Sequence, residues 1–152
     1  MAELRVSVDP QEVFCVPGLG SCVGIVLYDP VATVAGMAHI MLPSSQQGIL
    51  GDRPAKFADT AIFALLGSIV SAGAQRDRIV AKATGGSQMF RSQGEFLTIG
   101  TRNVDAMYRT LERAKIPIIA ADLGGTWGRT ARFFMNDWRL QIRASGRPDL
   151  DL

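Results

Sequence analysis

Two apolar runs separated by a short turn segment constrain the fold of this chain more than any other feature. The first run, 22–28, begins with a cysteine, and the second, 33–41, contains the only histidine of the sequence. The intervening segment 29–32 reads Asp-Pro-Val-Ala, with proline at the position that a tight turn favours. The pattern therefore predicts an antiparallel β-hairpin.

The expected register of this hairpin brings a thiol beside an imidazole. A centre between Pro30 and Val31 places Cys22 directly opposite His39. Directly opposed residues share one face of the sheet, with Cβ atoms about 4.5–5.5 Å apart. A bulge or a different loop length would shift this register. In the expected register, Cys22 and His39 are the thiol and the neighbouring base that an activated cysteine nucleophile requires.

A glycine-punctuated turn, 18–22, leads into the cysteine. Glycines leave backbone N–H groups unobstructed, so Gly20 and Ser21 are expected to help form an oxyanion hole. Ser21 is itself a second, weaker candidate nucleophile. A hydroxyl has a much higher pKa than a thiol, and no carboxylate is in view to support the histidine.

Composition and charge exclude several classes of protein. Apolar residues make up 47% of the chain and charged residues 20%, which is typical of a globular domain with a good core. A net charge of +2 with scattered arginines argues against nucleic-acid binding. The sequence contains no targeting segment and no apolar run of the roughly 20 residues that span a bilayer. We therefore expect a cytoplasmic protein that does not insert into membranes.

No metal, cofactor or disulfide is expected. The chain has two cysteines and one histidine, without the paired spacings of a zinc site. Pairing of Cys15 with Cys22 is disfavoured in a reducing compartment.

Apolar periodicity predicts the remaining elements. Small and apolar residues at spacings of three and four indicate a helix over 58–69, with Gly73 as its stop. A second amphipathic helix is expected to begin with Thr101 as its N-cap and to run to Ala114. Further strands are predicted at 4–9, 78–84, 116–122, 132–135 and 138–143.

Sequential hairpins with two inserted helices are typical of an α+β fold. We expect a mostly antiparallel sheet with two main helices covering one face. The length of 152 residues fits a single domain, 1–152, and the polar tail 144–152 is expected to be loose.

Several further residues are candidates for contacts with a substrate. A double glycine and a serine follow the predicted strand 78–84, where we favour a tight turn beside the active site over a phosphate-binding loop. An arginine lies near the start of the second helix, where the helix dipole disfavours a cation, and this can mark a binding role. The candidates are Gly85, Gly86, Ser87, Arg102 and Asn103.

These motifs together resemble those of the CheD family of chemoreceptor glutamine deamidases. They occur in family order from about residue 4 to residue 143. The residues that carry the resemblance are Gly18-Leu19-Gly20-Ser21-Cys22-Val23, Asp29-Pro30, Met37-Ala38-His39-Ile40-Met41-Leu42-Pro43, Lys56-Phe57-Ala58-Asp59-Thr60-Ala61, Gly85-Gly86-Ser87-Gln88-Met89-Phe90, Ile99-Gly100-Thr101-Arg102-Asn103 and Asp122-Leu123-Gly124-Gly125.

The resemblance implies a layered α/β/β architecture and a protein-glutamine glutaminase activity. Proteins of this family hydrolyse glutamine side-chain amides of chemotaxis receptors to glutamate without a cofactor. Cys22 matches the family nucleophile and His39 the family histidine. The implied partners are the methyl-accepting chemotaxis receptors and a CheC-type phosphatase.

One position departs from the family pattern. The family's third catalytic residue is a threonine six positions before the cysteine, and this chain has Val16 there. Valine has no hydroxyl, although its backbone carbonyl can still orient His39. This departure favours a rival hypothesis, a non-catalytic adaptor that binds chemoreceptors or a CheC-type phosphatase. A thiol hydrolase or transglutaminase with unrelated protein substrates is a further alternative.

Overall fold

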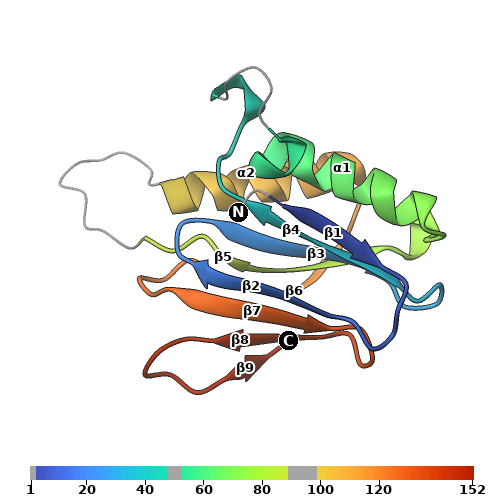
Figure 1. Ribbon diagram of the computed structural model, residues 1–152. Helices are drawn as coiled ribbons and strands as arrows, with labels where there is room; N and C mark the ends of the chain where they lie inside the picture. Colours follow the sequence, from blue (N-terminus) through green and yellow to red (C-terminus); the bar gives the residue numbers. More distant parts are fainter. Residues whose placement is uncertain (1–2, 48–52, 89–98) are drawn as a thin grey trace.

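The computed structural model has three layers, two helices on top of two stacked β-sheets (Figure 1). It describes residues 3–47, 53–88 and 99–152. One sheet has the strand order β1-β4-β3-β5-β6 and the other the order β2-β7-β8-β9. The α+β class, the mostly antiparallel pairing, the two main helices and the α/β/β layering are confirmed.

The bounds of the elements follow the predicted pattern closely. The two α-helices are α1 (Ala58–Ser71) and α2 (Ile99–Ala114). The strands are β1 (Leu4–Ser7), β2 (Val13–Leu19), β3 (Val23–Asp29), β4 (Val34–Ile40), β5 (Val80–Gly85), β6 (Ile118–Leu123), β7 (Arg129–Phe134), β8 (Arg139–Arg143) and β9 (Leu150–Asp151). Neither α1 nor α2 is long and apolar enough to cross a membrane, and the described ranges contain no other candidate.

Strands β3 and β4 lie at the centre of the molecule and are buried on both faces. One face packs under α1 and α2, and the other packs against the second sheet. On β3, Ile25 faces the helices and Val26 faces the second sheet. A strand buried on both faces reads as a continuous apolar run, which is why the sequence shows no alternation here.

Two expectations are corrected by the structure. Helix α2 begins at Ile99, so Thr101 lies inside its first turn and does not cap it. The parallel pairing of β5 with β6, through a connection that contains α2, is compatible with the predicted mostly antiparallel sheet.

The tail is also not loose, because β9 pairs with β8 and Leu152 exchanges two backbone hydrogen bonds of 3.0 Å with Leu140. The Lys82 side chain, buried between the sheets, donates to the backbone oxygens of Trp138 at 2.6 Å and Leu152 at 2.8 Å. A buried ammonium needs such acceptors, and they anchor the tail.

Candidate active site

Cys22 lies in a bend between β2 and β3, one residue before β3 begins. Its side chain is half-buried and packs against the apolar cluster between the two sheets. In Figure 1 this bend lies at the left, close to the start of α2. Gly24, two residues later on β3, faces the same cluster, because a Cβ there would contact Leu19 and Met37.

The expected pairing of Cys22 with His39 is wrong by two residues. In the observed register Gly24 opposes His39. The reason is the position of the four-residue loop between β3 and β4, which spans 30–33 and not the expected 29–32, because Asp29 still pairs with Val34 and Thr33 takes a left-handed φ of 55°. A shift of two residues preserves the face, since side chains alternate with a period of two. Cys22 is therefore a diagonal neighbour of His39.

His39 projects from β4 toward the second sheet. On this strand Met37 faces the cluster between the sheets and Ala38 faces the helices, so alternation places His39 with Met37. Diagonal neighbours in an antiparallel pair lie roughly 7–8 Å apart, within reach of a long or aromatic side chain. The imidazole of His39 thus points to the side of the sheet that Cys22 occupies.

Burial favours the uncharged forms of both groups. Burial raises the pKa of the Cys22 thiol, and a hydrogen bond from its own backbone N–H opposes this. Burial also lowers the pKa of His39, which is 8% exposed. Its Nε2 is buried and makes no hydrogen bond within the described part of the chain. A neutral imidazole with an unpartnered nitrogen is a competent proton acceptor.

Hydrogen bonds fix the bend that carries Cys22. The backbone N–H of Ser87 donates to the Gly20 carbonyl at 2.8 Å, and that of Gly86 donates to the Cys22 carbonyl at 2.8 Å. The Nδ2 of Asn103 donates to the Ser21 carbonyl at 2.9 Å. Three consecutive carbonyls are thus held by groups outside the bend.

Fixing these carbonyls also fixes the N–H groups of the bend. A trans peptide unit is planar, so each N–H points opposite to the carbonyl of the preceding residue. The N–H of Ser21 consequently points away from Ser87, and the N–H of Cys22 points away from Asn103. Rigid donors of this kind are what an oxyanion hole requires.

Asn103 and Ser87 are buried braces and present no side chain to a substrate. Asn103 is fully buried, and its Nδ2 also donates to the Met41 carbonyl at 3.0 Å, which ties the bend to the end of β4. Ser87 is 1% exposed, and its Oγ donates to the backbone oxygens of Gly124 and Trp127. Both residues were expected to contact a substrate; in the structure, the Asn103 side chain and the Ser87 backbone N–H hold the Cys22 bend.

The double glycine allows the close approach of β5 to the Cys22 bend. Gly85 and Gly86 have left-handed φ values of 113° and 67°. A Cβ on Gly85 would collide with the carbonyl oxygen of Cys22, and a Cβ on Gly86 would collide with Val104 of α2. The absence of side chains on Gly85 and Gly86 therefore lets β5 pack against the Cys22 bend and α2. Arg102 is partly exposed on the first turn of α2, so among the predicted substrate contacts its side chain is the one that reaches solvent.

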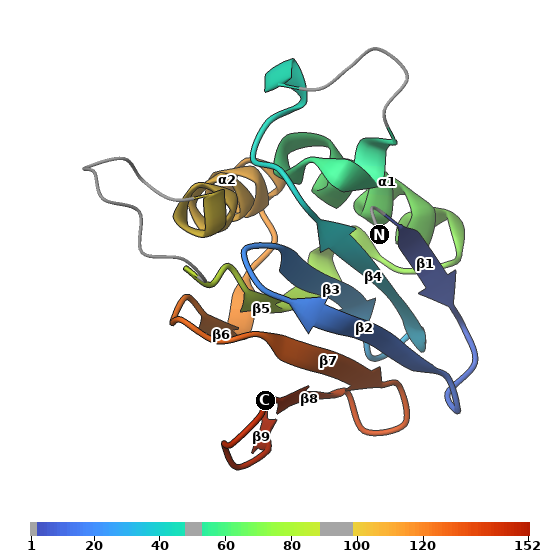
Figure 2. The same ribbon diagram turned by 60° about the vertical axis from the view of Figure 1, so that its left-hand side comes forward.

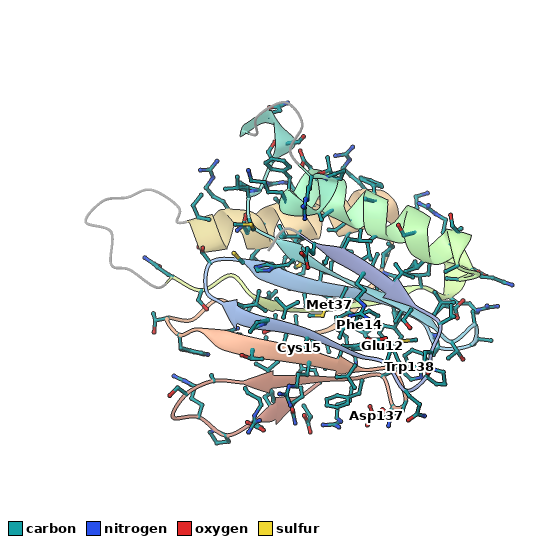
Figure 3. The ribbon with its side chains drawn as sticks, in the orientation of Figure 1. Glu12, Phe14, Cys15, Met37, Asp137 and Trp138 are labelled. Carbon is teal, nitrogen blue, oxygen red and sulfur yellow. The ribbon has the colours of Figure 1, made fainter. Side chains whose placement is uncertain are left out.

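A cavity of about 240 Å³ opens between the edge strands β1 and β2 and reaches His39. Figure 2 shows these two strands on the same side of the sandwich. Val16 and His39 both line the cavity, together with Phe14 and Met37, which Figure 3 labels between the two sheets. Val16, the position expected to match the family threonine, therefore opens on the same cavity as His39, and its side chain ends in methyl groups.

Cys15 occupies a different environment from Cys22. It is exposed on β2, whereas Cys22 is half-buried, and both are free thiols. The sequence pattern did not reveal the bracing role of Asn103 or the residue opposite His39, Gly24. For Gly24 a signal was available, because a glycine within an apolar strand often marks a place where another group approaches the backbone closely.

Comparison with known proteins shows the family to which this chain is similar. The family model described as CheD chemotactic sensory transduction matches residues 41–144. A protein named chemoreceptor glutamine deamidase CheD from Halalkalibacterium halodurans is 49% identical over 146 residues, covering 94% of this chain and 90% of the relative.

Two further relatives are named probable chemoreceptor glutamine deamidase CheD. The one from Caldanaerobacter subterraneus is 45% identical over 96% of this chain and 91% of its own length. The one from Symbiobacterium thermophilum is 42% identical over 100% of this chain and 94% of its own length. Because these similarities extend over nearly the whole length of both partners, the chain belongs to the CheD family.

Proposed function

We propose that this protein hydrolyses the side-chain amides of chemoreceptor glutamines to glutamate and ammonia. The observation that supports the proposal is a thiol and an imidazole on the same side of one sheet: Cys22 lies in a bend held by hydrogen bonds just before β3, and His39 lies on the adjacent strand β4. The relatives that share this chain's length bear the same activity in their names. The substrates are methyl-accepting chemotaxis receptors.

The first half-reaction forms a thioester. His39 accepts the proton of Cys22, and the thiolate attacks the amide carbon of the glutamine. The N–H groups of Ser21 and Cys22 stabilise the resulting oxyanion. The imidazolium then gives its proton to the leaving nitrogen, the C–N bond breaks, and ammonia departs.

The second half-reaction releases glutamate. His39 accepts a proton from water, and the hydroxide attacks the thioester carbon through a second oxyanion at the same N–H groups. The C–S bond breaks and the imidazolium returns its proton to Cys22. Every proton is carried by one of these two side chains, so this scheme uses no cofactor. Ser21 is not the nucleophile in it, because a hydroxyl would need a stronger base.

Mass spectrometry of a receptor cytoplasmic fragment tests the proposal. Incubation with the wild-type protein is expected to convert specific glutamines to glutamates, and Cys22→Ala is expected to abolish the conversion. Cys15→Ala, which alters the exposed thiol on β2, serves as the matched control and should leave the rate unchanged. Unmodified glutamines after incubation with wild type would contradict the proposal.

A second candidate function is a non-catalytic adaptor for chemoreceptors or for a CheC-type phosphatase. The specific observation in its favour is Val16, which lines the cavity beside His39 without a hydroxyl. Binding of a receptor fragment by both wild type and Cys22→Ala, with no deamidation by either, is the result expected for an adaptor. A CheC-type phosphatase as a regulatory partner stays a prediction from the family resemblance, and a cytoplasmic location stays a prediction from the sequence.

A further inference from the structure

Glu3 lies directly across the sheet from His39. The pairing of β1 with β4 runs from Leu4 opposite Ala38, and one more step places Glu3 opposite His39. The backbone confirms this step, because the His39 N–H donates to the Glu3 carbonyl at 3.1 Å. Opposed residues of an antiparallel pair project from the same face, with Cβ atoms about 4.5–5.5 Å apart.

The two side chains also meet in one cavity. Glu3 and His39 both line the cavity between β1 and β2. Glu3 is exposed, so its carboxylate keeps its hydration while it faces a buried ring. Val16 lines the same cavity from β2 and offers the imidazole no side-chain hydrogen bond. The carboxylate is therefore the acidic group that the register brings to this histidine.

Charges around His39 act in opposite directions. Burial lowers the pKa of His39, the positive charge of the chain's amino terminus acts in the same sense, and the Glu3 carboxylate raises it. Arg5 lines the cavity as well, but its guanidinium is paired with Glu12 at 3.3 Å. Among the described residues that line the cavity, the remaining titratable group is the thiol of Cys15. Cys22 packs against the same cluster between the sheets, and Tyr28 and Asp29 lie at the far end of β3.

We propose that Glu3 is a positioning residue that orients His39 and stabilises its imidazolium form while the proton of Cys22 resides on the ring. The proposal rests on the deamidase function proposed above. Glu3 touches no reacting atom. The proton passes from Cys22 Sγ to the imidazole and leaves with ammonia, and the carboxylate keeps its charge throughout. Glu3, one residue before β1, thereby orients the His39 ring, as the hydroxyl of a threonine in place of Val16 on β2 would do.

The experiment uses Cys22 alkylation, which needs no receptor. Iodoacetamide labelling of the full chain is followed from pH 5 to 9 for wild type, Glu3→Gln, Glu3→Asp and His39→Asn. Glu112→Gln is the matched control, because it removes the same charge from an exposed position on α2, on the opposite face of the sheet. Because the chain has one histidine, NMR titration of its ring protons reports on His39 without ambiguity.

Loss of the Glu3 charge is expected to disfavour the imidazolium. In Glu3→Gln, the His39 titration moves to lower pH and the labelling rate of Cys22 at pH 7 falls about two- to fivefold. Glu3→Asp keeps the charge and restores most of the rate, and Glu112→Gln matches wild type. Superimposable titration curves and rates for wild type and Glu3→Gln overturn the proposal.

Receptor deamidation by the wild type is measured separately. If wild type fails to deamidate while labelling still depends on Glu3, the proposed function is wrong and the positioning role of Glu3 stands. If wild type deamidates and Glu3→Gln changes neither labelling nor titration, the function stands and the role of Glu3 is wrong.

Discussion

At the residue scale, the decisive contrast is between the two cysteines. Cys22 lies on the same face as a base, whereas Cys15 is an exposed thiol on β2. A thiol is activated when a neighbouring base takes its proton, and reactivity follows the thiolate fraction. The environment of His39, and not exposure, therefore determines which thiol reacts.

Cys22 is expected to react with iodoacetamide faster than Cys15 at neutral pH. His39→Ala should slow the labelling of Cys22 and leave that of Cys15 unchanged, because the Cys15 thiol is exposed and does not join the cluster between the sheets against which Cys22 packs. Peptide mapping of the labelled protein measures the two rates separately. Equal rates at both thiols, unaffected by His39→Ala, would identify Cys22 as an ordinary thiol.

Val16→Thr tests whether a missing hydroxyl limits the reaction. Pro17 restrains Val16 to an extended conformation, so the Val16 carbonyl has a fixed direction. If that carbonyl or Glu3 orients His39, Val16→Thr should change the deamidation rate less than about threefold, a small part of the roughly 10²–10⁴-fold that general-base catalysis contributes.

The measurement compares wild type, Val16→Thr and Cys22→Ala on one receptor fragment. A wild type as inactive as Cys22→Ala, with activity restored by Val16→Thr, would mean that this chain has lost the enzymatic function and acts as an adaptor.

At the scale of elements, the Cys22 bend depends on its neighbours. Strand β5 ends at Gly85 and is followed by Gly86, and the N-terminal part of α2 contributes Asn103. These elements come from distant parts of the sequence and meet around one bend. The geometry of the nucleophile is thus a property of three packed elements.

Gly85→Ala is expected to displace the bend, whereas Gly73→Ala is expected not to. Both glycines have nearly the same left-handed φ, 113° and 111°, but a Cβ on Gly73 meets nothing within 4 Å. The shared backbone strain costs about 1–2 kcal/mol in each variant. The collision with the Cys22 carbonyl adds a further loss that is specific to Gly85→Ala.

Chemical denaturation and receptor deamidation together separate the two effects. Both variants should be less stable than wild type, and Gly85→Ala alone should lose at least about tenfold in turnover, which corresponds to roughly 1.4 kcal/mol in the transition state. Equal turnover in the two variants would show that the position of the Cys22 carbonyl does not matter.

At the scale of the whole molecule, one buried carboxylate links the hairpin to the rest of the fold. Asp29, fully buried at the end of β3, accepts hydrogen bonds from the N–H groups of Val31 and Ala32 in its own loop. It also accepts from the Gln75 N–H at 2.8 Å and from Arg78. Burial by itself would raise the pKa of Asp29, but these donors outweigh it and lower the pKa to about 2.

Asp29→Asn is expected to lower the free energy of unfolding by about 2–3 kcal/mol at neutral pH, because it leaves the partly buried Arg78 without its counter-ion. The folded-state pKa is depressed from 3.8 to about 2, so this stabilisation is complete above pH 3.8 and is lost as the pH falls toward 2. The difference in the free energy of unfolding between wild type and Asp29→Asn should therefore become smaller as the pH falls from 3.8 to about 2.

Denaturation curves of wild type and Asp29→Asn at several pH values measure this deficit. Asp77→Asn, which removes an exposed carboxylate next to Arg78 in sequence, is the control and should change stability by less than about 0.5 kcal/mol. A deficit that stays constant down to pH 2 would show that the charge of Asp29 does not stabilise the fold.

The sequence by itself determined the features that depend on local periodicity. Apolar runs around a turn predicted the β3–β4 hairpin, and spacings of three and four predicted α1 and α2. The observed register differs from the expected one by two residues, an even number, so it leaves the expected face of Cys22 relative to His39 unchanged.

Only the tertiary structure decided the features that depend on pairing between distant segments. The hairpin register is set by Asp29, whose carboxylate closes a four-residue loop while it binds Arg78, far along the chain. The placement of Glu3 opposite His39 depends on β1 pairing with β4, and no local pattern specifies that pairing. Periodicity records which face of a strand is apolar, but not which strand lies beside it, so the surroundings of the nucleophile emerge only when the sheets assemble.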